Sequence, residues 1–206
     1  MEWGWPDGRE KPQDRALWDH LLLTARQVHQ RTPALSVFCP FPEDVTPQEV
    51  KPFGIPAAHL MAAELGWSSD DIVELRDAFI TAGSLAQWRE TYKDTDIGQD
   101  FMDRFACYCL IGVGGAFTSS KMCAWVVYMP PHLHYPWHHH PGEEMYLTLA
   151  GEAEFMREGA PNEILRPGDT SQHASNQPHA METHAHPVMA YVVWRNGFET
   201  PPVLTE

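Results

Sequence analysis

The chain has 206 residues, which fits one domain or one domain with an extension and excludes a large multidomain assembly. Hydrophobic residues make up 43% of it and charged residues 20%, so the composition is that of a folded protein and excludes a disordered one. The formal net charge of −14 repels nucleic-acid phosphates and anionic lipids, and we therefore expect neither as a partner.

The sequence also bears on location and redox state. Residues 1–10 contain no basic segment followed by an apolar stretch, and runs such as residues 21–23 are too short to cross a bilayer. We therefore expect a soluble, cytoplasmic protein. The four cysteines form neither a C-x-x-C pair nor a dense disulfide framework, which predicts reduced, buried thiols at Cys39, Cys107, Cys109 and Cys123.

The first half of the chain has the apolar spacing of helices. Asp14 is placed to cap a helix whose apolar residues share one face: Trp18, Leu21, Leu22, Ala25 and Val28. Six prolines between residues 32 and 56 interrupt any regular pattern, so we expect a loop there. Helix is expected to resume near Ala57.

Three further helical segments are predicted before the pattern changes. Ser68 and Asp71 have the spacing of a capping box ahead of an apolar stripe that runs from Ile72 to Ala82. Residues 85–92 are expected to be a shorter helical piece, and residues 99–105 a last helix or turn. The tryptophans of this half are interpreted as packing residues, on helices that cover the second half or form a homodimer contact: Trp3, Trp5, Trp18, Trp67 and Trp88.

From residue 107 onward the pattern is that of short strands. Residues 122–129, 145–149 and 188–194 are rich in apolar and β-branched side chains and are bounded by prolines and glycines. Such spacing predicts a mainly β fold, a small β-barrel or jelly roll over residues 107–206, preceded by a helical region over residues 1–106. The glycines at 112, 114 and 115 lack the spacing of a phosphate-binding loop and are assigned to a turn.

Histidines are concentrated in this second half, between His132 and His186. Because residues two apart in a strand face the same side, His138 and His140 can converge while His139 points away. A turn at Pro141 and Gly142 would then place three further side chains on one face: Glu144, Tyr146 and Thr148. Two imidazoles and a carboxylate suit a first-row divalent metal.

A fourth ligand is expected from a distant strand. The turn formed by Pro167, Gly168 and Asp169 is followed by Pro178 and His179, which makes His179 the first candidate and His173 the next. Mixed nitrogen and oxygen ligands accept iron, zinc, manganese, nickel or cobalt, so the sequence predicts one divalent transition metal without choosing it.

These motifs resemble those of the cupin superfamily. The spacing His138-x-His140-x3-Glu144-x6-Gly151 matches the first cupin motif without a gap, and the Pro-Gly-Asp turn with His179 matches the second. Thr183 stands where many cupins have Asn, a difference that affects packing and leaves the ligand set intact. The resemblance implies a cupin barrel that binds one metal.

Three aromatic residues narrow the resemblance to the cupin-type dimethylsulfoniopropionate lyases: Tyr135, Tyr146 and Trp194. That resemblance implies a carbon–sulfur lyase acting on a small zwitterion. Beside a metal-bound Glu144 a dication favours the phenolate of Tyr146, which makes Tyr146 the expected general base. Aromatic faces hold a sulfonium cation best, so Tyr135 and Trp194 are expected to bind it, with Trp137 and Tyr191 as further candidates and His173 in the pocket wall.

Two other functions fit the same scaffold. An iron-dependent dioxygenase would consume oxygen, and a non-catalytic metal cupin would be stabilised by a small molecule without turning it over. The remaining histidines are interpreted as rim or turn residues, of which His132 and His134 are candidates for substrate contact: His132, His134, His184 and His186.

Overall fold

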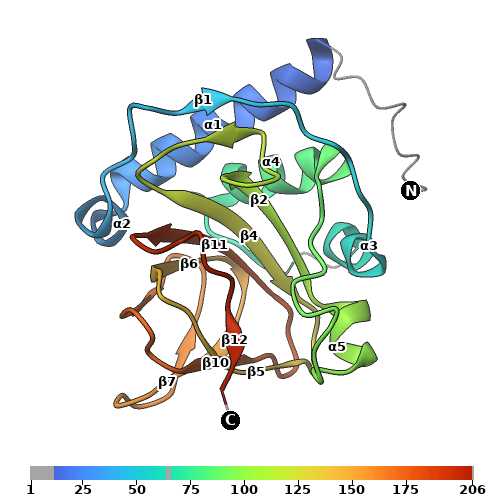
Figure 1. Cartoon of the computed structure of the whole chain (residues 1–206), viewed down its shortest axis with the longest axis vertical. Coiled ribbons are helices and arrows are strands. Elements are labelled where there is room, and N and C mark those ends of the chain that lie inside the picture. Colours follow the sequence, from blue (N-terminus) through green and yellow to red (C-terminus); the bar gives the residue numbers. More distant parts are fainter. Residues whose placement is uncertain (1–11, 64–65, 206) are drawn as a thin grey trace.

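A computed structural model describes residues 12–63 and 66–205 (Figure 1). Trp3, Trp5 and residues 1–10 lie outside the described part of the chain. None of the described helices is both long enough and apolar enough to span a membrane. The described helices are α1 (Pro12–Arg31), α2 (Pro33–Phe38), α3 (Pro56–Ala63), α4 (Val73–Ala82), the 3₁₀ helix η1 (Gly83–Leu85) and α5 (Gln99–Arg104).

The described strands form two sheets, one in the order β1-β3-β2-β4-β11-β6-β9 and the other in the order β12-β5-β10-β7-β8. All pairings are antiparallel except that of β2 with β3. The strands are β1 (Thr46–Pro47), β2 (Ala106–Ile111), β3 (Phe117–Thr118), β4 (Cys123–Met129), β5 (His134–His139), β6 (Glu143–Gly151), β7 (Ala153–Arg157), β8 (Glu163–Leu165), β9 (Thr170–His173), β10 (His179–Glu182), β11 (Val188–Arg195) and β12 (Val203–Leu204).

Helices α1 and α4 cover the outer face of the larger sheet, and β5, β7 and β10 lie on its other side (Figure 1). This arrangement confirms the predicted fold class, a two-sheet β-barrel preceded by helices. The first long barrel strand, β2, begins at Ala106. The division into residues 1–106 and 107–206 stays a prediction, because the helices and the sheet share one core.

Strand parity separates the two faces of the larger sheet. Along β11, Tyr191 and Val193 belong to the core beneath the helices, whereas Val192 and Trp194 belong to the cluster inside the barrel. Tyr146 of β6 likewise points into the barrel. The alternation predicted from the sequence therefore decides which side chains can reach the interior.

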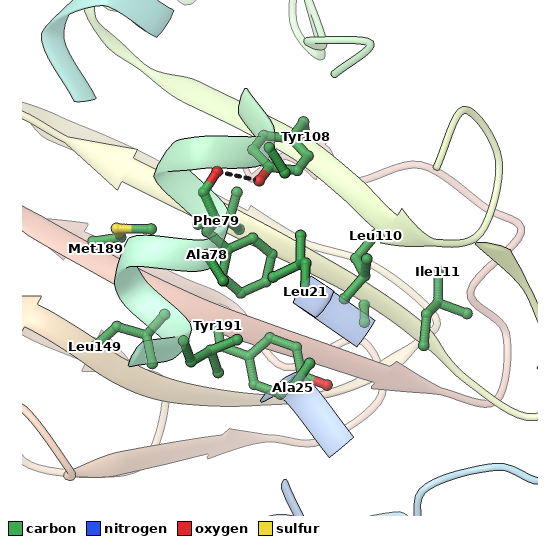
Figure 2. Close-up of a cluster of buried hydrophobic side chains, with 14 of the residues drawn as sticks. Leu21, Ala25, Ala78, Phe79, Tyr108, Leu110, Ile111, Leu149, Met189 and Tyr191 are labelled. Atoms are coloured by element: carbon green, nitrogen blue, oxygen red, sulfur yellow. Dashed lines mark hydrogen bonds between the residues drawn. The ribbon is translucent and has the colours of Figure 1, made fainter. Parts of the chain in front are cut away.

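The core between helices and sheet is apolar and closely packed (Figure 2). Leu21 and Ala25 of α1 and Phe79 of α4 meet Tyr191 of the sheet there. Tyr108 is fully buried, and its hydroxyl donates to the carbonyl oxygen of Phe79 at 2.5 Å. The predicted apolar face of the first helix is confirmed, since Trp18, Leu21, Ala25 and Val28 are all buried and Leu22 packs against them.

Several boundaries in the helical half were predicted wrongly. Helix α1 begins at Pro12, so Asp14 lies in its first turn and does not precede it. The proline-rich segment contains the short helix α2, because Pro33 occupies the first helical position, where its missing N–H costs nothing. It also contains β1, so it is only partly a loop.

The capping box is wrong as well. Helix α4 begins at Val73 without a side-chain cap, and the hydroxyl of Ser68 donates instead to the carbonyl oxygen of Leu149 in β6, at 2.6 Å. Trp67 is 42% exposed and meets His186 edge-on, so it is no core residue. Predicted packing is confirmed for Trp18 and Trp88, which are buried.

The segment 85–92 is not helical. Its first residue, Leu85, is the last residue of η1, and Trp88 then forms an isolated antiparallel bridge with Tyr108 of β2. Contacts with the sheet override the local apolar spacing here. The helix expected at residues 99–105 is confirmed by α5, and residues 112–115 form the expected turn. All four cysteines are buried and free, as predicted.

Candidate functional site

Strand register brings four predicted metal ligands together inside the barrel. Because β10 pairs with β5, His179 lies directly opposite His138. His140 follows the end of β5, two residues beyond His138 and buried on the same side. Glu144 enters from β6 in the other sheet, and all four side chains are about 2% exposed.

The ligand atoms are close enough to share one ion. One nitrogen from each of His138, His140 and His179 lies within 4.8 Å of the others. The Oε2 atom of Glu144 is 3.5 Å from Nε2 of His140 and 3.1 Å from Nε2 of His179. His139 points away, as parity requires, and bonds Thr205 through Nδ1.

Backbone carbonyls orient these imidazoles. Nδ1 of His138 lies 2.8 Å from the carbonyl oxygen of Pro136, and Nδ1 of His140 lies 2.9 Å from that of Gly142. Nδ1 of His179 lies 2.8 Å from the carbonyl oxygen of Gln177. A carbonyl oxygen only accepts, so each Nδ1 carries the proton and each Nε2 presents a lone pair.

The resulting pocket of lone pairs fits a cation. Nε2 of both His140 and His179 is buried without a hydrogen-bond partner, and both face the Glu144 carboxylate. Lone pairs that converge in a buried space repel one another unless a positive charge lies between them. The residues present therefore match the donor set of a first-row divalent metal.

Glu144 is held from behind by two neutral donors. Nε1 of Trp194 donates to Oε1 at 2.6 Å, and Nδ1 of His173 donates to Oε2 at 2.8 Å. Burial by itself would raise the pKa of Glu144, but positive charge at the positions of His140 and His179, together with hydrogen bonds, outweighs it and holds that pKa well below its ordinary value. A dication held by these two imidazoles would supply that charge with both rings neutral. Glu144 is therefore a carboxylate at neutral pH.

His173 does not line the cavity, so its predicted contact with substrate is not supported. Its Nδ1 faces Glu144 and its Nε2 accepts from the hydroxyl of Ser171 at 3.1 Å, which leaves neither nitrogen free. Burial lowers the pKa of His173 to about 4. His173 therefore positions the carboxylate as a neutral donor, in line with its register opposite Glu144 on β9.

A cavity of about 580 Å³ opens from this group of ligands, which is the size of an ordinary small-molecule site. His138, Glu144 and Tyr146 line its buried end, and Tyr135 and Trp194 flank them. Tyr135 stacks on His138 with ring centroids 4.0 Å apart, and Trp194 stacks on His140 at 3.9 Å.

Tyr146 lies beside the carboxylate and is 3% exposed. Burial raises the pKa of its phenol well above 10, and the negative charge of Glu144 raises it further. The phenol is therefore protonated unless a positive charge lies nearby. A metal dication held by its neighbours would supply that charge.

Two predicted substrate contacts are wrong in position. Tyr191 lies on the opposite face of β11, under the helices, where its hydroxyl faces Nδ1 of His29 at 3.4 Å. Trp137 is 38% exposed and does not line the cavity. The exposed histidines also stay outside the cavity lining: His132, His134, His184 and His186.

Some residues of the site were missed. Tyr92 is buried, and its hydroxyl lies 2.8 Å from that of Tyr135; it belongs to the segment that was predicted to be helical. Cys107, Trp125 and Arg89 line the cavity. Alternation along β4 could have indicated Trp125, since Cys123, Trp125 and Val127 share the interior face.

The chain also matches known proteins over most of its length. The family model described as dimethylsulfoniopropionate lyase matches residues 24–190. The chain is 52% identical over 188 residues to the dimethylsulfoniopropionate lyase DddQ of Ruegeria pomeroyi, covering 91% of this chain and 94% of that protein.

Solved structures show the same likeness. The crystal structure of the lyase DddQ from Ruegeria pomeroyi aligns with a TM-score of 0.90 and 51% identity, over 92% of this chain and 96% of that one. A chain from the crystal structures of the lyases RdDddP and RnDddQII aligns with a TM-score of 0.90 and 34% identity, over 94% of this chain and 100% of that one.

Proposed function

The chain belongs to the dimethylsulfoniopropionate lyase family, and from that membership we propose that it cleaves dimethylsulfoniopropionate to dimethyl sulfide and acrylate by β-elimination. The observation that carries the proposal is the meeting of three imidazoles, one carboxylate and one phenol inside the barrel, where His138, Glu144 and Tyr146 line the buried end of one cavity.

His138, His140, Glu144 and His179 would hold one divalent transition metal, with Fe, Zn, Mn, Ni and Co as the candidates. When bound, that ion would supply Lewis-acid stabilisation of negative charge on the substrate carboxylate and lower the pKa of a nearby phenol. Trp194 and His173 keep Glu144 in place by hydrogen bonds to its two oxygens.

Tyr146 is the proposed general base. Its phenol is beside Glu144 at the buried end of the cavity, where a substrate carboxylate would bind. Tyr146 removes the proton from the carbon next to that carboxylate, and the electron pair forms the new double bond. The carbon–sulfur bond breaks with its electrons on sulfur, so neutral dimethyl sulfide leaves and needs no acid.

Aromatic side chains are proposed to hold the sulfonium. This cation has no hydrogen-bond donor, so its favourable contact is with the face of a ring, worth roughly 0.5–2 kcal/mol. Tyr135 and Trp194 each pack one face on a ligand histidine and line the cavity with the rest of the ring. The hydrogen bond between the hydroxyls of Tyr92 and Tyr135 fixes the position of the Tyr135 ring.

The division of roles is tested with two variants. Tyr146→Phe should keep the metal and lose most of the elimination, by about a hundredfold or more, because it removes only the base. His138→Ala should lose both metal and activity. The measurements are metal content by elemental analysis and dimethyl sulfide by gas chromatography. Equal loss of metal in the two variants would contradict the assignment.

A further inference from the structure

The open end of the cavity contains a charged group that the elimination does not use. Val113, Glu199 and Thr200 are exposed and line this end, which we call the mouth, whereas the ligands His138 and Glu144 line the buried end. Among the described residues that line the cavity, Arg89 is the one lysine or arginine. In a chain of net charge −14 such a cation stands out electrostatically.

Arg89 is fixed against Trp125. The central carbon of its guanidinium lies 4.4 Å from the centre of the Trp125 ring. Its backbone N–H donates to the carbonyl oxygen of Cys107 at 2.9 Å, which anchors this segment to β2. No ion pair joins Arg89 to Glu199 or to another acid within the described residues, so its N–H groups are available to an anion.

Trp125 adds a second unpaired donor. Its Nε1 is buried and has no hydrogen-bond partner, although an indole N–H can only donate. Leaving such a group unpaired costs free energy, and an acceptor that enters the cavity would recover it. The guanidinium and this indole N–H belong to two side chains that contact each other and both line the cavity.

The pair is separated from the ligands by a second indole. Trp194 stacks on His140 at 3.9 Å, and the centroids of Trp194 and Trp125 are 5.9 Å apart. The order from the buried end is therefore His140, Trp194, Trp125 and Arg89. Arg89 packs on the last ring of this series and is partly exposed, so we place it where a substrate enters and a product leaves.

We propose that Arg89 and Nε1 of Trp125 form an outer carboxylate-binding subsite in the mouth of the cavity. The inference rests on the proposed function for its ligand: the carboxylate end of the zwitterionic substrate binds there on entry, and anionic acrylate binds there before release. A planar guanidinium suits a carboxylate because it can donate two parallel N–H bonds.

Binding of two half-substrates to the metal-loaded protein tests the subsite. Propionate carries the carboxylate without the sulfonium, and trimethylsulfonium carries the sulfonium without the carboxylate. By calorimetry, propionate should bind in two events, one at the metal and one at the mouth, and Arg89→Gln should weaken the second event about tenfold or more and leave trimethylsulfonium within about twofold. Arg89→Lys keeps the charge and loses the planar arrangement of donors, so its affinity for propionate should lie between those of the unaltered protein and Arg89→Gln. Trp125→Phe keeps the ring face and removes Nε1, so it should weaken propionate by a smaller factor.

Arg31→Gln is the matched control, because it removes one positive charge from the exposed end of α1 far from the cavity lining. Unchanged propionate affinity in Arg89→Gln, or propionate that does not bind the unaltered protein, would overturn the subsite. An equal loss of affinity for both probes would also overturn the subsite, because it would show that Arg89 only shapes the cavity wall. Because neither probe is turned over, a protein without lyase activity that still binds propionate through Arg89 would refute the function and keep the subsite.

Discussion

Single hydrogen bonds decide how the ligand side chains of this site are presented. Each ligand imidazole places Nδ1 on a backbone carbonyl, so the metal-facing nitrogen is fixed by the chain itself and needs no other side chain. Glu144 depends on side chains instead, namely Trp194 and His173. The carboxylate is therefore the ligand whose position is most sensitive to mutation.

Trp194→Phe tests this dependence. The variant keeps a ring to stack on His140 and removes the donor to Oε1 of Glu144. We expect metal affinity to fall about ten- to a hundredfold, because loss of such a supporting bond loosens a ligand. Competition with a chelator of known affinity measures it. Trp125→Phe is the control, because it makes the same substitution at a tryptophan that donates no hydrogen bond to a ligand residue. An equal loss of metal affinity in that variant would refute the role of Trp194.

At the scale of elements, the junction between β6 and β11 imposes the closest approach found at any described glycine. Gly151 has a φ of +65°, and a Cβ there would lie 1.7 Å from the carbonyl oxygen of Pro187. Gly151→Ala must move backbone, so we expect it to lower the free energy of unfolding by about 3 kcal/mol or more. Urea denaturation measures this.

Gly159 provides the comparison for that substitution. Its φ is also positive, at +80°, but nothing lies within 4 Å of a Cβ placed on it. Gly159→Ala should therefore cost only the conformational penalty, about 1–2 kcal/mol. If the two alanine variants were equally stable, the close approach of Gly151 to Pro187 would have no energetic weight.

The attachment of α1 to the sheet should depend on pH. His29 is buried, its Nε2 donates to the carbonyl oxygen of Cys39 at 2.6 Å, and its Nδ1 faces Tyr191. Desolvation lowers the pKa of His29 below its ordinary 6.5. The unfolded chain then binds this proton at a higher pH than the folded protein does. Stability is therefore complete above about pH 6.5 and decreases as the pH falls toward the lowered value.

His29→Gln removes the titration and keeps a donor. Between about pH 7.5 and about pH 5, its free energy of unfolding should fall less than that of the unaltered protein. Histidines elsewhere contribute equally to both proteins and cancel in the comparison. Parallel curves for the two proteins would show that His29 contributes no pH dependence.

The elements also show what could be predicted from the sequence. Strand parity and the histidine spacing placed His138, His140 and Glu144 on the same side, because their relation is local to two strands that follow one another in the sequence. The orientation of Trp194 and the position of Tyr92 could not be predicted, since they depend on which strand pairs with which. Residues 85–92 were predicted wrongly for the same reason: their partner, Tyr108, lies in a strand of the sheet.

In the molecule as a whole, the helices cover the larger sheet from outside and the barrel contains the site. The helices bury one face of the larger sheet, which leaves its other face to form a cavity lined by polar and aromatic side chains. The strongly acidic surface is unfavourable for a free anion, whereas a zwitterion carries no net charge. The net charge therefore favours the proposed zwitterionic substrate over a free anion.

We propose that the buried ligands and Tyr146 together cleave dimethylsulfoniopropionate. The most direct measurement is to incubate purified, metal-analysed protein with this compound and quantify both products by gas and liquid chromatography while dissolved oxygen is monitored. We predict equal amounts of dimethyl sulfide and acrylate with no oxygen consumed. Metal-loaded protein that releases neither product, or that consumes oxygen as the substrate disappears, would contradict the account.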